Sequence, residues 1–139
     1  ILMLCTNTRA RARVQLKAAR CVHASAQSIL GEAYRDGVGV PKDDAEALKW
    51  FRLAADQGKA SAQNNLGVMY ANGFGVPQDY AEAVELYRLA ANRGDAIAPS
   101  NLGGMYFNST GVPRDYVGAH VWFNLASANG LEIAGKWRD

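Results

Sequence analysis

Residues 66–94 read LGVMYANGFGVPQDYAEAVELYRLAANRG, and this stretch has a related copy 36 residues before it and another 36 residues after it. Several positions are identical in all three copies: Gly31, Gly67 and Gly103; Tyr34, Tyr70 and Tyr106; and the Gly-Val-Pro tripeptides at 39–41, 75–77 and 111–113. A period between about 20 and 50 residues is typical of repeat proteins in which each unit buries its apolar face against its neighbours. The sequence therefore predicts one stacked domain of three units, at residues 24–59, 60–95 and 96–131.

Each unit reads as two antiparallel helices, here named helix A and helix B, joined by a turn that contains glycine and proline. Apolar residues recur at helical spacing, as Ala62, Leu66 and Met69 do in the middle unit. Helix A is predicted over residues 24–36, 60–72 and 96–108, and helix B is predicted to begin near Asp43, Asp79 and Asp115.

The predicted start of helix B carries a capping signal. Asp43 with Glu46, and Asp79 with Glu82, have the spacing of a capping box, in which two side chains satisfy amides that would otherwise lack partners. Unit three has Gly118 in place of the glutamate, so we expect its helix B to fray more easily. Each helix B is followed by a glycine suited to the left-handed residue that closes a helix: Gly58, Gly94 and Gly130.

Each helix A contains an interior glycine, which costs about 1 kcal/mol relative to alanine in a helix. A cost repeated at Gly31, Gly67 and Gly103 indicates a repeated structural need, and close approach of helix B is the simplest one. The other columns that are identical in all three units are likewise attributed to packing and turns. They include Leu53, Leu89 and Leu125.

The segments beside the three units are weaker copies of the repeat. Residues 1–23 are predicted to form a basic, degenerate helix B or a cap, and residues 132–139 to begin a C-terminal capping helix. The formal net charge of +2 divides into +5 before Glu32 and −3 from there on (+2 less +5). No aromatic residue lies among the N-terminal arginines, so a solvated helix face is favoured and no nucleic-acid partner is expected.

The sequence contains no membrane or export signal that we recognise. No apolar run approaches the roughly 18 residues of a membrane span, and residues 1–5 are too short for a signal-peptide core. Cys5 and Cys21 both precede the full units, and we favour free thiols over a disulfide bridge between them. The compartment stays open, with the bacterial cytoplasm or the cell envelope favoured.

The middle unit carries the pattern Leu66-Gly67-x-x-Tyr70-x-x-Gly73-x-Gly75-Val76-Pro77-x-Asp79-x-x-x-Ala83, then Tyr87-Arg88-x-Ala90-Ala91-x-x-Gly94. Over about residues 24–131 this resembles the Sel-one-like repeat family, a 36-residue relative of the tetratricopeptide repeats. The resemblance implies an all-α fold, a right-handed α-solenoid of helix-turn-helix units, and a non-catalytic role as a scaffold or adaptor for other proteins. Unit three departs from the pattern at Ser109, so we expect a local difference in its turn.

Two other functions stay open. One secreted branch of the family carries a disulfide in every repeat, and β-lactam binding has been proposed for it. The three full units here contain no cysteine, so this branch fits poorly. An envelope or secreted β-lactam-binding or hydrolase-like protein is therefore only the second hypothesis. The third is a structural spacer within a longer solenoid.

The resemblance also implies where a partner binds, because in tetratricopeptide-like arrays variable helix-A positions line the concave groove. Helices packed about 8–10 Å apart give a groove roughly 25–30 Å long, which fits about eight residues of an extended peptide. Asn64 and Asn72 are predicted to face the same way and to bind a ligand backbone, while Phe107 offers an apolar anchor. Arg35 is predicted to pair with a ligand carboxylate. The candidate partner-binding residues are Ser28, Glu32, Arg35, Asn64, Val68, Ala71, Asn72, Ser100, Phe107 and Asn108.

No catalytic, cofactor or metal site is expected, and the chain is predicted to be a monomer or to self-associate weakly end to end. His23 and His120 are the only histidines, and His120 lies in the column of Leu48 and Val84, which predicts a partly buried packing role. Histidine and cysteine do not recur at metal-ligand spacing. The glycines at 37–39 follow a helix and not a strand, so they do not form a phosphate loop.

Overall fold

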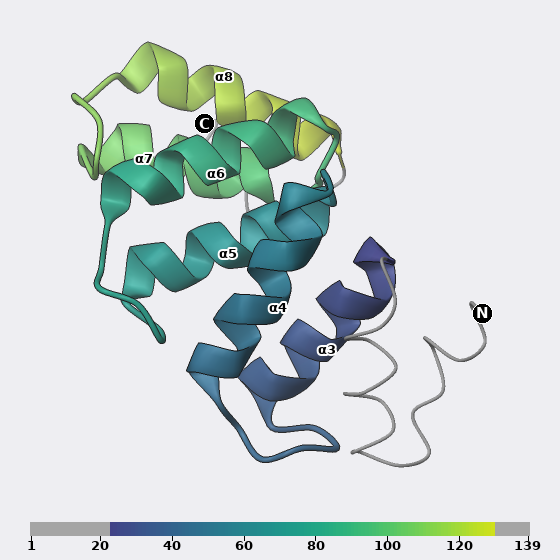
Figure 1. Ribbon diagram of the computed structural model, residues 1–139. Coiled ribbons are helices and arrows are strands. Elements are labelled where there is room, and N and C mark those ends of the chain that lie inside the picture. Colours follow the sequence, from purple (N-terminus) through teal and green to yellow (C-terminus); the bar gives the residue numbers. More distant parts are fainter. Residues whose placement is uncertain (1–22, 130–139) are drawn as a thin grey trace.

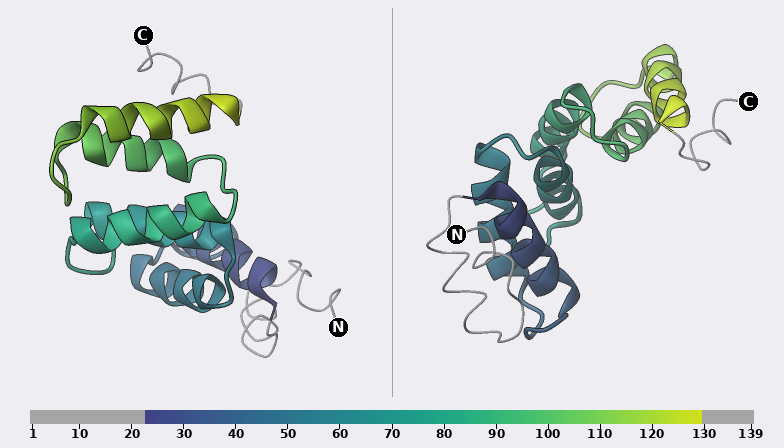
Figure 2. Two further views of the ribbon diagram at one scale, coloured as in Figure 1. Left: turned by 90° about the horizontal axis from the view of Figure 1, so that it is seen from above. Right: turned by 90° about the vertical axis from the view of Figure 1, so that its right-hand side faces the viewer.

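The computed structural model describes residues 23–129, which form six helices and no strand (Figure 1). The helices are α3 (Ala24–Asp36), α4 (Asp44–Asp56), α5 (Ala60–Asn72), α6 (Tyr80–Asn92), α7 (Ala98–Asn108) and α8 (Tyr116–Ala128). They pair into three hairpins in chain order, and Figure 2 shows the hairpins following one another along a bent path. The predicted all-α solenoid is confirmed. Residues 1–22 of the segment predicted at 1–23, the segment predicted at 132–139, and Cys5, Cys21 and Gly130 lie outside the described residues.

The helices of each hairpin pack closely at the glycine of helix A. A methyl group built on Gly31 would lie 2.7 Å from the ring of Phe51, and one on Gly103 would lie 2.8 Å from the ring of Phe123. Neither distance leaves room for a side-chain carbon. The prediction that these glycines admit helix B is confirmed.

The turn within each hairpin begins with a left-handed residue. Gly37 and Gly73 end α3 and α5 with φ near +70°, the region that glycine enters without strain. Ser109 takes the same place after α7 with φ 58°. The prediction of a local difference in the turn of unit three is therefore wrong for the backbone conformation, because Ser109 adopts the same left-handed conformation as Gly37 and Gly73.

The helix-B caps follow half of the predicted capping box. The Asp43 side chain accepts a hydrogen bond from the Glu46 amide, and Asp79 caps α6 in the same way. The reciprocal half is absent, because the Asp43 amide donates instead to the Tyr34 carbonyl. Unit three keeps its cap, since Asp115 accepts from the Gly118 amide at 2.9 Å.

Helix α7 begins two residues later than predicted. The Asp95 carboxylate accepts hydrogen bonds from the amides of Ile97 and Ala98, and this short-range turn replaces the first helical bonds. Pro99 follows in the first turn, where its missing amide hydrogen costs nothing.

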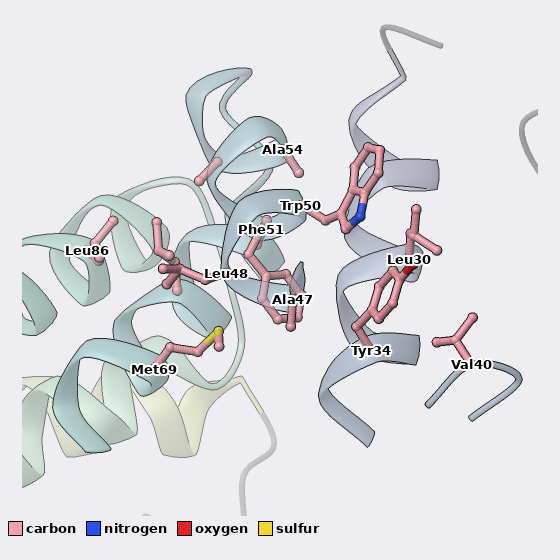
Figure 3. Packing of buried hydrophobic residues seen from close by; sticks show 13 residues of the cluster. Leu30, Tyr34, Val40, Ala47, Leu48, Trp50, Phe51, Ala54, Met69 and Leu86 are labelled. Carbon is pink, nitrogen blue, oxygen red and sulfur yellow. The ribbon is translucent and has the colours of Figure 1, made fainter. Parts of the chain in front are cut away.

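The hydrophobic core is continuous from one hairpin to the next. Phe51 of α4 and Met69 of α5 belong to one buried cluster (Figure 3), and Val84 of α6 and Leu102 of α7 belong to another. Each unit therefore completes the core of its neighbour, as a solenoid requires.

A polar contact also recurs between consecutive units. The Arg52 guanidinium on α4 donates to the Tyr70 hydroxyl on α5 at 2.8 Å, and Arg88 on α6 donates to Tyr106 on α7 at the same distance. This bond raises the pKa of Arg88 above its ordinary value, since it stabilises the charged guanidinium. Unit three has Asn124 at the corresponding position.

Two expectations about burial are wrong. His120 is exposed, whereas Leu48 and Val84 of the same column are buried. The next hairpin covers that face of α4 and α6, and no hairpin follows α8 within the described residues. Packing alone does not explain the leucine that recurs at Leu53, Leu89 and Leu125, which we call the leucine column. These side chains are 40%, 50% and 41% exposed, respectively.

Candidate partner-binding surface

The A helices of consecutive units touch directly. The Arg35 guanidinium on α3 donates to the side-chain oxygen of Asn65 on α5 at 3.0 Å. Further along, the Asn101 amide on α7 donates to the side-chain oxygen of Asn64 at 3.0 Å. These bonds make α3, α5 and α7 neighbours along one side of the stack. We call the exposed and half-exposed residues of these three helices the A-helix surface.

Two predicted site residues do not reach this surface. Ser28 is 3% exposed and Asn64 is 5% exposed, so both side chains belong to the interior. Asn72, eight residues after Asn64, is exposed, and its side-chain amide donates to the Val68 carbonyl at 2.8 Å. The pair therefore does not present two matching amides to a ligand. Spacing alone placed both on one face, but α7 packs over Asn64 and not over Asn72.

Arg35 already has partners within the chain. Its guanidinium forms a salt bridge with Asp36 at 2.8 Å and lies 5.8 Å from the centre of the Phe51 ring. The hydrogen bond between the two raises the pKa of Arg35 and lowers the pKa of the Asp36 carboxyl. The predicted pairing of Arg35 with a ligand carboxylate would have to compete with this bridge. Glu32 is half-buried on the same helix.

The other predicted residues lie on α5 and α7. Val68 and Ala71 are half-buried and pack against the second core cluster. Ser100 is half-buried near the start of α7, while Phe107 and Asn108 are exposed at its end. The Phe107 ring meets Tyr116 edge to face at 5.2 Å between centroids, which fixes its orientation.

The A-helix surface carries little charge beyond α3. Helices α5 and α7 contain no aspartate, glutamate, lysine or arginine, and their polar residues are serine, asparagine, glutamine and tyrosine. Asn65 and Asn101, half-buried members of this surface, were not among the predicted site residues. The corresponding residue in unit one is Ile29, so this repeat position varies between units as the predicted site positions do. That variation is the sequence signal that could have identified Asn65 and Asn101.

The described residues show no group of three or more histidine, cysteine, aspartate or glutamate side chains placed to hold a metal ion. None of the helices between residues 23 and 129 is long and apolar enough to cross a membrane.

Comparison with known proteins agrees with this architecture. The sequence matches the Sel1 repeat family at residues 24–59, 60–95 and 98–131. The chain belongs to this family. Sel1 repeats mediate protein interactions, and the proteins that contain them are typically non-catalytic scaffolds. This Sel1 repeat chain has no significant match among the curated proteins.

Two solved structures resemble this Sel1 repeat chain in sequence as well as fold. A protective antigen present in uropathogenic Escherichia coli strains, which displays an SLR fold, is 39% identical with a TM-score of 0.85 over 91% of the chain. A Sel1 repeat protein from Oxalobacter formigenes is 35% identical with a TM-score of 0.84 over 92% of the chain. The chain spans 28% of the first protein and 53% of the second.

A third structure shares the fold at lower identity. Cysteine-rich protein B of Helicobacter pylori is 23% identical with a TM-score of 0.70, over 88% of this chain and 94% of its own. At this identity the likeness shows the fold alone.

Proposed function

We propose that this chain is a non-catalytic scaffold that binds an extended segment of a partner protein on the A-helix surface. Its membership of a family of interaction scaffolds supports the general role. The observation that carries the location is the composition of α5 and α7, which expose amides and the Phe107 ring and contain no charged residue.

Such a surface suits a peptide backbone. A side-chain amide offers both donors and an acceptor, so it can pair with backbone N–H and C=O groups whatever the ligand sequence. Phe107, held by Tyr116, supplies an apolar contact at the end of α7. Asn65 and Asn101 already bridge neighbouring A helices, so they hold the surface in one arrangement before a partner binds.

The test compares two pairs of identical substitutions. Asn72→Lys with Asn108→Lys places two charges at the ends of α5 and α7, on the A-helix surface. Asn92→Lys with Asn124→Lys places the same charges on α6 and α8, and all four asparagines are exposed. Partners captured from the native cell by the unaltered chain are identified by mass spectrometry, and their affinity for each variant is measured by calorimetry.

The proposal expects the pair on α5 and α7 to weaken the captured partner at least about tenfold, roughly 1.4 kcal/mol. The pair on α6 and α8 should stay within about twofold of the unaltered chain, since it changes charge equally on the opposite helices. Equal loss in both pairs, or loss only in the second, would remove the A-helix surface from the binding site.

A further inference from the structure

A cavity of about 290 Å³ lies between the helix-B elements α4 and α6, with α5 behind it. Its apolar wall is formed by three leucines, Leu66, Leu86 and Leu89. Leu89 belongs to the repeated leucine column and is half exposed. The cavity shares only Tyr70 with the A-helix surface, and its presence partly explains why Leu89 is not fully buried.

Three residues that line the cavity carry hydrogen-bond acceptors that have no partner among the described residues. Gln63 is 4% exposed, and its side-chain oxygen accepts no hydrogen bond, although its amide donates weakly to the Ala55 carbonyl at 3.3 Å. The carboxylates of Asp56 and Glu82 also line the cavity, and neither forms an ion pair within the described residues. A buried acceptor without a donor costs about 1–3 kcal/mol, so the cavity favours a ligand that brings donors.

The neighbouring unit shows which group such an oxygen accepts. Gln27 precedes Gln63 by 36 residues and is also buried, and its side-chain oxygen accepts a hydrogen bond from the side-chain amide of Gln57 at 2.5 Å. The residue 36 positions after Gln57 is Arg93. Its guanidinium lies against Gly58, within 2.7 Å of where a methyl group on that glycine would be, and not on Gln63. The internal donor of unit one is therefore lacking in unit two.

The positions 36 residues further along the chain do not carry the same set of acceptors, so the repeat pattern does not require them. Between α6 and α8 the corresponding residues are Asn92, Pro99 and Gly118, and Trp122 replaces Leu86. The arginine–tyrosine contact is kept in both grooves, so it serves the architecture. The set of acceptors is specific to the groove between units one and two.

We propose that this cavity binds a lysine side chain of a partner protein. The four methylenes of lysine pack against the three leucines, as long basic side chains commonly do on apolar surface. The ammonium carries three N–H donors, which the Gln63 oxygen and the carboxylates of Asp56 and Glu82 accept. The lining has a net charge of −1, from one basic residue and two acidic residues. The basic residue, Arg52, donates a hydrogen bond to the Tyr70 hydroxyl.

This site lies between the B helices α4 and α6 and goes beyond the proposed function, so either proposal can fail alone. The test is an NMR titration of the ¹⁵N-labelled chain with Nα-acetyl-lysine N-methylamide. The matched probe is Nα-acetyl-norleucine N-methylamide, which has the same stem and no ammonium. We expect the lysine probe to shift the Gln63 side-chain amide with a Kd on the order of 1 mM, and the norleucine probe to bind about tenfold more weakly.

Two charge variants locate the ammonium. Asp56→Asn with Glu82→Gln should weaken the lysine probe about tenfold, and both residues are exposed, so the fold should persist. Glu46→Gln with Glu85→Gln removes two charges from the same helices outside the lining and should change the affinity less than twofold. Equal binding of the two probes, or equal weakening by the two variants, would overturn the proposal.

A third variant tests whether the site is vacant. If Arg93 donates to Gln63 in solution, Arg93→Ala, which introduces no new donor, would shift the Gln63 side-chain amide without any probe and would raise the affinity for the lysine probe. That result would overturn the proposal, because the acceptor would then have an internal partner. An unchanged Gln63 amide in Arg93→Ala supports it.

Discussion

Two adjacent glycines of α7 have opposite structural roles. A methyl group on Gly103 would lie 2.8 Å from the buried ring of Phe123, whereas a methyl group on Gly104 would meet nothing within 4 Å. Gly103→Ala should therefore destabilise the fold by about 1 kcal/mol, since overpacking outweighs the gain in helix propensity. Gly104→Ala should stabilise it by about 0.5–1 kcal/mol. Urea unfolding of the two variants measures both, and a similar sign for the two would contradict the close approach.

Tyr87 predicts a loss of stability in alkali. Burial raises its pKa from 10.0 to about 12, because a phenolate would be poorly solvated among the core residues. The unfolded chain loses this proton at lower pH than the folded chain does. The contribution of Tyr87 is therefore complete below pH 10 and is lost as the pH rises toward 12.

Tyr87→Phe removes this pH-dependent contribution to the free energy of unfolding. Phenylalanine fills the same column in the other units, at Phe51 and Phe123, so the variant should fold normally at pH 7. Between pH 10 and 12 its free energy of unfolding should fall by roughly 2 kcal/mol less than that of the unaltered chain. Identical pH profiles for the two proteins would show that the Tyr87 pKa is not raised.

At the residue scale, the sequence predicted the packing inside one repeat unit and missed the burial that depends on contacts between two units. The glycines under Phe51 and Phe123 follow from a cost repeated within each helix A. The burial of Asn64 depends on how α7 lies over α5, and the exposure of His120 depends on the next hairpin. Neither relation between units can be read from spacing inside a unit.

At the element scale, only one of the two hydrogen bonds of the capping box forms at the helix-B caps. The aspartate side chain accepts from the helix amide, and the glutamate side chain does not accept from the aspartate amide. Asp43→Ala removes the bond to the Glu46 amide and should cost about 1 kcal/mol. Glu46→Ala should cost less than about 0.5 kcal/mol, because this side chain makes only an exposed contact with Lys49 at 3.8 Å. Thermal unfolding of both variants tests the asymmetry, which equal losses would contradict.

The arginine–tyrosine contact should stabilise the docking of one hairpin on the next. Tyr106→Phe removes a part-buried hydrogen bond from Arg88, with an expected cost of about 1 kcal/mol. Tyr80→Phe is the control, since its hydroxyl bonds only to Gln78 two residues away and is exposed. Chemical denaturation should show a clear loss for the first and almost none for the second. The reverse order would mean that the contact does not join the units.

The helix bounds were predictable because caps, turns and apolar periodicity are local. Helices α3 and α5 have the predicted bounds, and α4, α6 and α8 begin within a residue of the predicted starts. Helix α7 ends as predicted but begins two residues late, because the Asp95 carboxylate reorganises its first turn. The contacts between Arg52 and Tyr70, and between Arg88 and Tyr106, join residues 18 apart on different hairpins. Their recurrence at the repeat period was visible in the sequence, but not their pairing.

On the scale of the whole molecule, the stack separates two kinds of surface. Helices α5 and α7 provide an uncharged side with asparagines and Phe107, and α4 and α6, with α5 behind them, form the cavity with its acceptors. The sequence predicted the first as a group of variable positions, of which Ser28 and Asn64 proved buried. It did not indicate the second, since the cavity is formed by three helices from two units.

The central claim is that partner binding belongs to the A-helix surface of a stack of hairpins. Hydrogen exchange of the chain, with and without its captured partner, tests this most directly. We predict slower exchange on binding in α5 and α7, residues 60–72 and 98–108, and little change in α6 and α8, residues 80–92 and 116–128. Protection confined to α6 and α8, with none in α5 and α7, would contradict the account.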